Sequence, residues 1–272
     1  MTTRADIFSK QPGGESRLAY TCNLGWLDLG HMNPSGPAEL WRNMLAGGDD
    51  AYIIDAVKIN PSAALALAAP RAVLSKLNVP SELIEKNRKF ITFRDGARGF
   101  KLEYKQSMHK KFGPRRFSRS AGGAYLIRQG LTLEQKKSVA LAIYMEVSHG
   151  FERMQGSFPQ SILTGDSSYS QEDLISNLVG FHIAIGTISR ESALIASRVV
   201  TEQLAAQIWD REGAVGKMKN LEFKPMFAKS TVNAASFVSV DECLDQPKIP
   251  PPFLYSVKPA QKGALFMDYP QF

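Results

Sequence analysis

Residues 132–155 carry the periodic signal that most restricts the fold of this chain. Apolar residues recur there at helical spacing and would share one face of a long helix. The residues of this face are Val139, Ile143, Val147, Phe151 and Met154. Thr132 and Gln135 have the spacing of a capping box, which predicts the start of the helix. Gly156 and Pro159 favour its end, so the next element must return along the same apolar face.

Further helices are predicted around this one. A short helix is expected from Pro34 to about Ala46, and residues 61–78, rich in Ala and Leu, favour another. Ser170 suits an N-cap, and the apolar residues after it predict a helix to about Ile185. Another helix is expected from Arg190 to Asp210.

Residues 89–128 have a different pattern. Short aromatic and apolar runs flank Asp95-Gly96, a dipeptide that favours a hairpin turn. Ala124–Ile127 is expected to form a third strand, and the basic segment from His109 to Arg119 is expected to be a loop. The chain is therefore predicted to have an α+β fold, mainly α-helical, with a small antiparallel β-sheet or hairpin in the middle.

The expected domain layout follows from these elements. Residues 1–17 are polar and predict a flexible leader. Residues 18–212 are expected to form a single catalytic-type domain with a basic β-hairpin insertion at 86–128. Residues 213–272 are expected to form an irregular C-terminal extension packed on that domain.

Positive charge is concentrated in one part of the chain. The formal net charge is +7, and residues 86–119 contain twelve Lys and Arg against two acidic residues. A local basic surface suits an anionic partner, and Lys101, Lys105, Arg115 and Arg116 are the candidate substrate-binding residues. The alternative is a solvated hairpin whose lysines only keep it soluble. An anionic cell-wall polymer is the expected partner, and nucleic acid is not expected.

Composition excludes several classes of protein. No run of about 18 apolar residues occurs, so no transmembrane segment is expected. The N-terminus lacks the apolar core of a secretory signal, so the chain is expected to be made in the bacterial cytoplasm and, if exported, to leave without a classical signal peptide. Two cysteines, Cys22 and Cys243, make no cysteine-rich scaffold; they are either one bridge or two separate small apolar residues.

The candidate chemistry lies at the end of the long predicted helix. Glu146, His149 and Glu152 are each three residues apart and would share a helical face. Such a series offers ligands for zinc or another divalent metal, or an acid–base pair. The alternative is a helix-end histidine bonded to Glu146.

Polar residues beyond that helix join the same candidate site. Asp166 lies in the following loop and is a candidate catalytic carboxylate. Asp173 and Asn177 are four residues apart on the next predicted helix. If the two helices pack antiparallel, these two residues face the Glu146–Glu152 segment and support it. The alternative for Asp173 is a favourable charge at a helix N-terminus.

His31 is the candidate ligand from outside this cluster. It follows Asp28-Leu29-Gly30 at the end of an apolar segment, and Asp28 is expected to orient the imidazole as a supporting acceptor. The predicted metal ligands are thus His31, His149 and Glu152.

Two blocks of the chain resemble a bacterial envelope-associated family, domain of unknown function 4056. The first block, residues 20–31, reads Tyr-Thr-Cys-Asn-Leu-Gly-Trp-Leu-Asp-Leu-Gly-His, and the second covers residues 146–185 and contains Ser-Tyr-Ser-Gln-Glu-Asp-Leu-Ile-Ser-Asn-Leu. The resemblance implies that His31, His149, Glu172, Asp173 and Asn177 form one site. This chain has Gly150 where the family carries Glu, so Glu152 or Glu146 has to replace that carboxylate.

These observations predict a hydrolase of a bacterial cell-envelope polymer, with peptidoglycan as the substrate and a metal-dependent amidase or peptidase as the enzyme class. A secreted antibacterial effector acting in the periplasm, with a cognate immunity protein, fits that expectation. A lysozyme-like glycosidase using Glu152 or Glu146 as general acid is the alternative, with Asp166 as its partner. A non-enzymatic module that binds envelope or nucleic acid is the third hypothesis.

Overall fold

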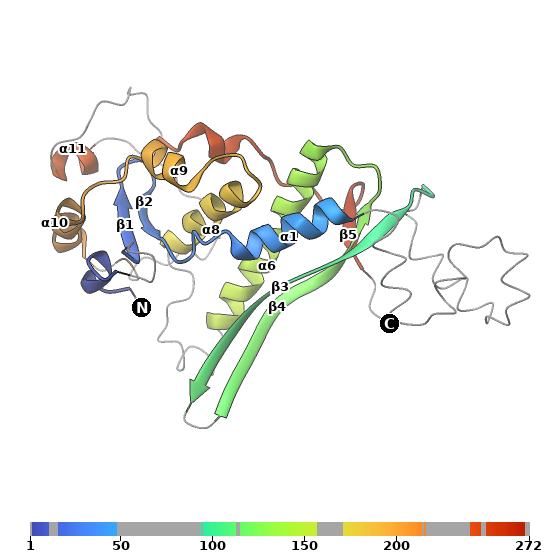
Figure 1. Ribbon diagram of the computed structural model, residues 1–272, viewed down its shortest axis with the longest axis horizontal. Coiled ribbons are helices and arrows are strands. Elements are labelled where there is room, and N and C mark those ends of the chain that lie inside the picture. Colours follow the sequence, from blue (N-terminus) through green and yellow to red (C-terminus); the bar gives the residue numbers. More distant parts are fainter. Residues whose placement is uncertain are drawn as a thin grey trace, which may run out of the picture. The chain divides into compact units, whose positions relative to one another are not determined.

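The computed structural model describes residues 2–10, 16–47, 93, 95–112, 115–156, 171–213, 215, 240–245 and 249–269 (Figure 1). The predicted α+β class is confirmed, because these residues form helices and small antiparallel sheets. The chain forms two compact units. Unit 1 contains residues 1–38 and 148–257, and unit 2 contains residues 39–147 and 258–272.

Unit 1 contains a two-stranded sheet. Strand β1 (Leu18–Thr21) pairs antiparallel with β2 (Gly25–Asp28), so that Leu18 lies opposite Asp28. Gly25 has φ +83°, a left-handed conformation that glycine adopts without strain, and it begins β2 directly after the turn. The apolar segment that holds Asp28 and His31 is therefore a short hairpin followed by a turn.

The helices of unit 1 surround this hairpin. They are the 3-10 helix η1 (Arg4–Ile7), α8 (Gln171–Ala184), α9 (Arg190–Ser197), α10 (Glu202–Glu212), α11 (Val240–Asp245) and the 3-10 helix η4 (Pro252–Tyr255). Ile7 is fully buried in a core cluster with Leu18, Tyr20, Ala205 and Ile208. The sequence predicts a flexible leader over 1–17, but η1 within it is packed, because Ile7 supplies apolar area to this core.

The single helix predicted from Arg190 to Asp210 is wrong. The segment forms α9 and α10, which are separated at Arg198, the C-cap of α9, with a left-handed φ of 61°. The residues after it run beside β1, and the N–H of Val200 donates to the carbonyl of Tyr20 at 3.0 Å. Thr201 then caps α10, its side chain accepting from the N–H of Leu204. Pairing with β1 thus competes successfully with helix propensity.

Cys22 and Cys243 form a disulfide, so of the two alternatives the bridge is the one found. It joins the turn after β1 to α11 across a sequence separation of 221 residues. Both sulfur atoms are consumed by the bond, so neither residue supplies a thiolate nucleophile in this state.

Unit 2 contains a long hairpin. Strand β3 (Gly99–Phe112) pairs antiparallel with β4 (Arg115–Arg128) along their whole length, and the two strands lie side by side in Figure 1. The loop predicted from His109 to Arg119 is wrong, because its described residues continue the strands. Ala124–Ile127 belongs to β4 and is not a separate strand. A turn does occur at Asp95-Gly96, but it precedes the long hairpin.

The inner half of this hairpin is buried. Phe100, Leu102 and Tyr104 on β3 are each at most 4% exposed. A third strand, β5 (Phe266–Asp268), pairs with Tyr125–Ile127 of β4. This end of the sheet therefore belongs to the core of unit 2.

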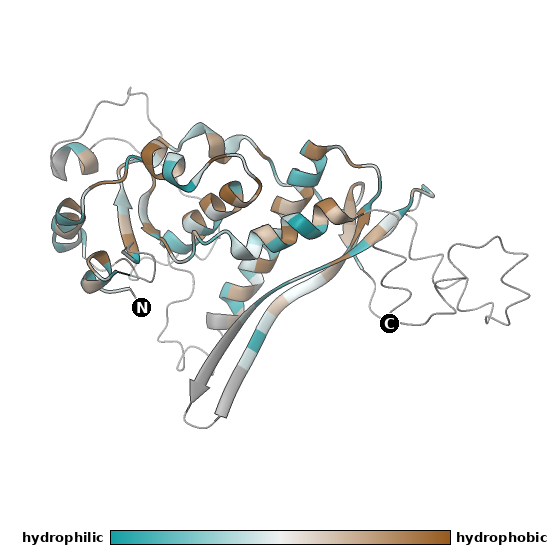
Figure 2. Ribbon diagram, in the orientation of Figure 1, coloured by the Kyte–Doolittle hydropathy of each residue, from teal (hydrophilic) through white to brown (hydrophobic). Residues whose placement is uncertain are grey.

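Two helices contribute to both units: α1 (Ser35–Ala46) and α6 (Leu133–Gly156). The capping box predicted for α6 is confirmed: the N–H of Thr132 donates to the Gln135 side chain at 2.9 Å, and the Thr132 hydroxyl accepts from the N–H of Gln135 at 3.3 Å. Hydrophobic residues recur along α6 and α8 in Figure 2. Among the described helices, none is both long and apolar enough to cross a membrane. The helix predicted at 61–78 lies outside the described residues.

Candidate metal centre

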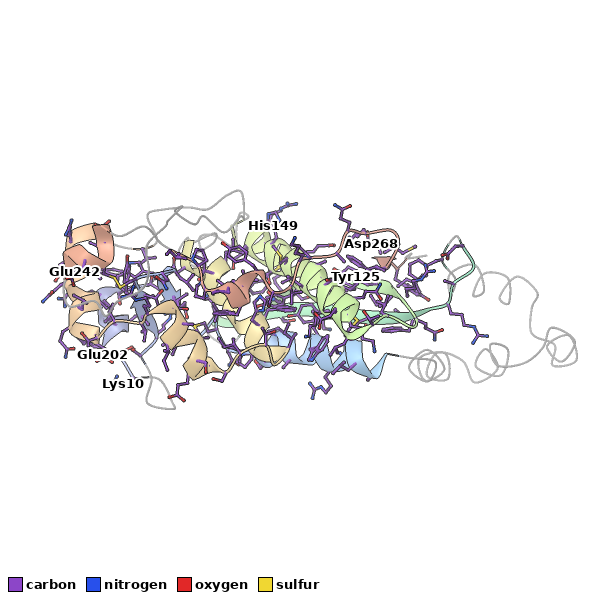
Figure 3. All side chains as sticks on the ribbon, turned by 90° about the horizontal axis from the view of Figure 1, so that it is seen from above. Lys10, Tyr125, His149, Glu202, Glu242 and Asp268 are labelled. Carbon is purple, nitrogen blue, oxygen red and sulfur yellow. A yellow bond between two sulfur atoms is a disulfide. The ribbon has the colours of Figure 1, made fainter. Side chains whose placement is uncertain are left out.

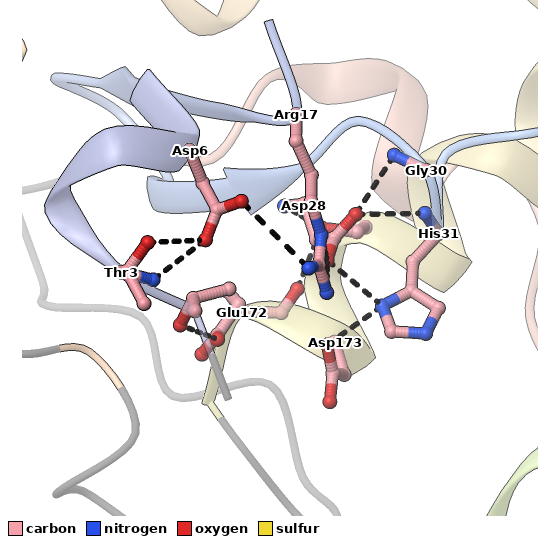
Figure 4. A network of polar contacts seen from close by, with 10 residues as sticks. Thr3, Asp6, Arg17, Asp28, Gly30, His31, Glu172 and Asp173 are labelled. Atoms are coloured by element: carbon pink, nitrogen blue, oxygen red, sulfur yellow. Dashed lines mark hydrogen bonds and ion pairs between the residues drawn. The ribbon is translucent and has the colours of Figure 1, made fainter. Parts of the chain in front are cut away.

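The centre begins at Asp28, the last residue of β2. Its side chain is almost fully buried, and its Oδ1 atom accepts hydrogen bonds from the N–H groups of Gly30 at 2.8 Å and His31 at 3.2 Å (Figure 4). An Asp side chain that accepts from residues further along the chain fixes a local turn. The carboxylate therefore folds the chain so that His31 returns toward it.

Helix α8 supplies the facing carboxylate. Glu172 and Asp173 are in its first turn, where the helix dipole favours negative charge. The Ser176 hydroxyl accepts from the N–H of Asp28 at 2.9 Å and donates to the carbonyl of Glu172 at 2.6 Å. Because Ser176 is fully buried, these two hydrogen bonds hold the end of β2 against α8.

His31 lies between these two carboxylates. Its Nδ1 atom is 2.7 Å from Asp173 Oδ1 and 3.6 Å from Asp28 Oδ2. Burial lowers the pKa of His31, but the hydrogen bond and charge of Asp173 and the charges of Asp28 and Glu152 outweigh it and raise the pKa to about 9. The side chain is 40% exposed, so the ring is reachable from solvent while Nδ1 faces the acids.

Further charges surround this group. Arg17 donates to Asp28 Oδ2 at 3.4 Å and lies 3.8 Å from Asp6. Glu152 and Glu172 are buried, and the Thr2 hydroxyl donates to Glu172 at 3.4 Å.

Asp28, His31 and Asp173 can together hold a metal ion. Each offers one ligand atom, and these atoms all lie within 4.8 Å of one another. One imidazole nitrogen with two carboxylate oxygens is a donor set that divalent metals accept. Within the described part of the chain this group offers three donors, and a metal held by three protein donors has coordination positions open, as in catalytic metal sites.

Two glycines allow the approach of these elements. A Cβ atom on Gly30 would lie 2.9 Å from Asp28 Oδ1, and one on Gly180 would lie 3.1 Å from the carbonyl oxygen of Met32. Gly180 is on α8, so its missing side chain lets that helix approach the main chain beside His31. Both glycines are visible in the sequence, but their role depends on this tertiary approach.

The three predicted site residues on α6 have different surroundings in the structure. Glu152 is buried and its charge acts on His31. Glu146 instead lies 2.8 Å from Lys262 and accepts from the Tyr125 hydroxyl at 3.4 Å, within unit 2. His149 is partly exposed on α6 (Figure 3). Burial and the charge of Arg153 lower the pKa of His149.

The ligand set therefore differs from the predicted one in its members. His31 is common to both sets. Asp28 and Asp173, expected only to support the site, are in the group that the structure brings together, whereas His149 and Glu152 are outside it. The roles predicted for His149 and Glu152 stay predictions. A signal for Asp28 was present in the sequence, since an Asp three residues before a His can place both in one turn.

The other predicted residues lie elsewhere. Asp166 lies outside the described residues, and Asn177 is partly buried on α8. Lys101 and Lys105 lie on β3, and Arg115 and Arg116 begin β4. Lys101 pairs with Glu103 at 2.5 Å, whereas Lys105 is exposed.

No family model matches the chain, and no curated protein or solved structure is significantly similar to it.

Proposed function

We propose that this protein is a divalent-metal-dependent hydrolase whose metal is held by Asp28, His31 and Asp173. The observation that carries the proposal is the convergence of these three side chains, from the end of β2, the next turn and the start of α8, with ligand atoms within 4.8 Å of one another. Zn²⁺ is the first ion to test, because it accepts mixed nitrogen and oxygen ligands and needs only three from a protein in catalytic sites.

The surroundings of the three ligands support this chemistry. A divalent cation would interact favourably with the carboxylates of Asp28 and Asp173, and its binding would displace the proton of His31, whose pKa is about 9. A metal in such a site lowers the pKa of bound water and makes a nucleophile at neutral pH. Glu152 is the candidate general base, because it is buried and near enough for its charge to act on His31. Ser176 and Arg17 hold Asp28 in place.

Peptidoglycan is the substrate class that we propose, with amide cleavage as the reaction. The support is the resemblance of residues 20–31 and 146–185 to an envelope-associated bacterial family. The Cys22–Cys243 disulfide adds weak support for action in the periplasm, because such bonds persist in oxidising compartments. Export without a classical signal, antibacterial action and a cognate immunity protein belong to this same proposal.

A metal-free glycosidase is the second candidate, and the position of Glu152 favours it. Glycosidases of this kind use a carboxylic acid as general acid, and Glu152 is a buried carboxyl group on α6 near His31. This alternative needs Glu152 but not a metal, which makes it separable by experiment.

The test combines metal analysis with digestion of purified sacculi. The wild type is expected to bind about one metal ion per chain and to release muropeptides cut at an amide bond. Asp173→Asn and His31→Ala should lose both properties. Asp210→Asn is the matched control, because Asp210 is an exposed acid that pairs with Arg4. His149→Ala decides whether His149 is a ligand, since loss of metal would add it to the set.

The possible outcomes of this test distinguish the candidate functions. Metal-independent release of glycan fragments that is lost in Glu152→Gln would replace the first candidate by the second. Neither metal nor digestion in the wild type would overturn both enzymatic proposals and leave the non-enzymatic binding hypothesis.

A further inference from the structure

The outer part of the β3–β4 hairpin pairs with no further strand among the residues that the structure describes. We define the outer hairpin as residues 105–112 of β3 and 115–122 of β4, in which Lys105 lies opposite Gly122 and Phe112 opposite Arg115. Strand β5 pairs only with residues 125–127, so among the described residues no third strand extends the outer hairpin. At about 3.4 Å per residue, this two-stranded arm is roughly 25 Å long.

The outer hairpin carries positive charge only. It contains no acidic residue and six cationic ones: Lys105, Lys110, Lys111, Arg115, Arg116 and Arg119. The exposed side chains described on it include Lys105, Ser107, Arg119 and Ser120. Ser107 and Ser120 are register partners, so two hydroxyl groups face each other across the strands. Lys, Arg and Ser are the side chains that proteins use to contact phosphate groups.

Protection of open strand edges is a simpler role for these lysines. Natural proteins place charged residues on exposed strands, because charge prevents edge-to-edge pairing between copies. Lysine is a usual choice for that role, so edge protection is a competing explanation that charge reversal separates from binding.

We propose that the outer hairpin binds duplex nucleic acid, through its phosphate backbone. A two-stranded β-ribbon fits into the major groove, which is about 12 Å wide. A lipid surface fits the described side chains less well, because peripheral binding to a bilayer uses inserted apolar side chains, whereas Lys105, Ser107, Arg119 and Ser120 are cationic or hydroxylic. The outer hairpin thus favours a partner that the sequence alone did not.

The proposal has a quantitative signature. Neutralisation of phosphates by Lys and Arg releases counterions, so log K falls with log salt with a slope of about −0.9 per phosphate contact. Six cationic residues limit the slope to about −5. This binding goes beyond the proposed hydrolase function and needs no metal.

The experiment measures binding of the full chain to a fluorescent 20-base-pair duplex by anisotropy, in EDTA, over a series of salt concentrations. The wild type is expected to bind with a slope between about −3 and −5. Lys105→Gln/Arg119→Gln should reduce its magnitude by about 1 to 2, since the register and strand alternation place the two side chains on opposite faces of the ribbon. The matched control is Arg42→Gln/Lys258→Gln, which removes the same charge from exposed residues outside the hairpin and should leave the slope unchanged.

Charge reversal separates binding from edge protection. Lys105→Glu/Arg119→Glu should remain monomeric by light scattering, because the strands stay charged, while duplex binding is lost. No binding by the wild type at low salt, or equal weakening in the control variant, would overturn the proposal. So would retention on sacculi or anionic vesicles without retention on the duplex. Because the assay contains EDTA, failure of the metal proposal does not affect this outcome.

Discussion

The Ser176 hydroxyl accepts a hydrogen bond from the main-chain N–H of Asp28 at 2.9 Å and so connects helix α8 to the end of β2. These residues are 148 positions apart in the sequence. The bond sets the distance between two carboxylates, those of Asp28 and Asp173, that come from different elements. The candidate metal centre depends on this connection as much as on its ligands.

Ser176→Ala tests that dependence. The variant leaves the Asp28 N–H buried without its partner, which costs about 1–3 kcal/mol of the free energy of unfolding. Loss of a group that orients a ligand lowers metal affinity by about 10–100-fold. Urea denaturation and calorimetric titration with Zn²⁺ measure the two effects. Ser118→Ala, at an exposed position on β4, is the control, and equal metal affinity in both variants would contradict the role of Ser176.

Gly30→Ala tests the turn that carries His31. The new Cβ would lie 2.9 Å from Asp28 Oδ1, an atom already held by two N–H groups. Relief of this contact has to break at least one of those bonds, so metal affinity is expected to fall about tenfold or more. Gly123→Ala is the control, because its nearest atom would be 3.5 Å away. A Gly30→Ala protein with wild-type affinity would show that the turn is free to adjust.

The burial of His182 predicts that the protein loses stability in acid. The side chain is fully buried on α8 between Phe181 and Phe253, and burial lowers its pKa to about 4. Its pKa when unfolded is about 6.5, so the unfolded chain binds the proton more tightly. The contribution of the neutral, buried His182 to the free energy of unfolding is fully present above pH 6.5. It falls by up to about 3 kcal/mol as the pH is lowered toward 4.

The measurement is the urea midpoint of wild type and His182→Leu between pH 7.5 and 4. The wild type is expected to lose stability more steeply below pH 6.5 than the variant, in which this proton site is absent. Parallel curves for the two proteins would show that His182 does not cause the acid sensitivity.

The Cys22–Cys243 bridge predicts a redox-dependent stability. A disulfide that closes so long a loop restricts the unfolded chain, and its removal typically costs 2–5 kcal/mol. Cys22→Ala/Cys243→Ala should unfold at lower urea concentration than the oxidised wild type, and reduced wild type should behave like the variant. If reduction leaves the midpoint unchanged, the bridge is not a stabilising element.

The sequence predicts local features of this fold better than distant ones. The capping box at Thr132 and the course of α6 and α8 were predictable, because both depend on neighbours within one turn. The break at Arg198 was not, because it is caused by pairing with β1, far away in sequence. The same reason explains the course of β3 through His109: cross-strand partners override a basic, loop-like composition.

The candidate site shows the same division. His31 was predicted as a ligand from its position after Asp28, a local pattern. That Asp173, and not His149, lies 2.7 Å from its ring depends on how α8 approaches the turn, which Gly180 and Ser176 determine. Helical spacing shows which residues share a face of α6 or of α8. It does not show which of these two helices lies beside the β1–β2 hairpin, which is far away in sequence.

Unit 1 is assembled from both ends of the chain, and this has a consequence during synthesis. Asp28 and His31 leave the ribosome well before Asp173, which follows 142 residues after His31. At a synthesis rate of about 5–20 residues per second, Asp173 is added roughly 7–30 s after His31. A nascent or truncated chain that ends before α8 therefore carries Asp28 and His31 but lacks the Asp173 carboxylate. The candidate centre can form only after α8 has been synthesised.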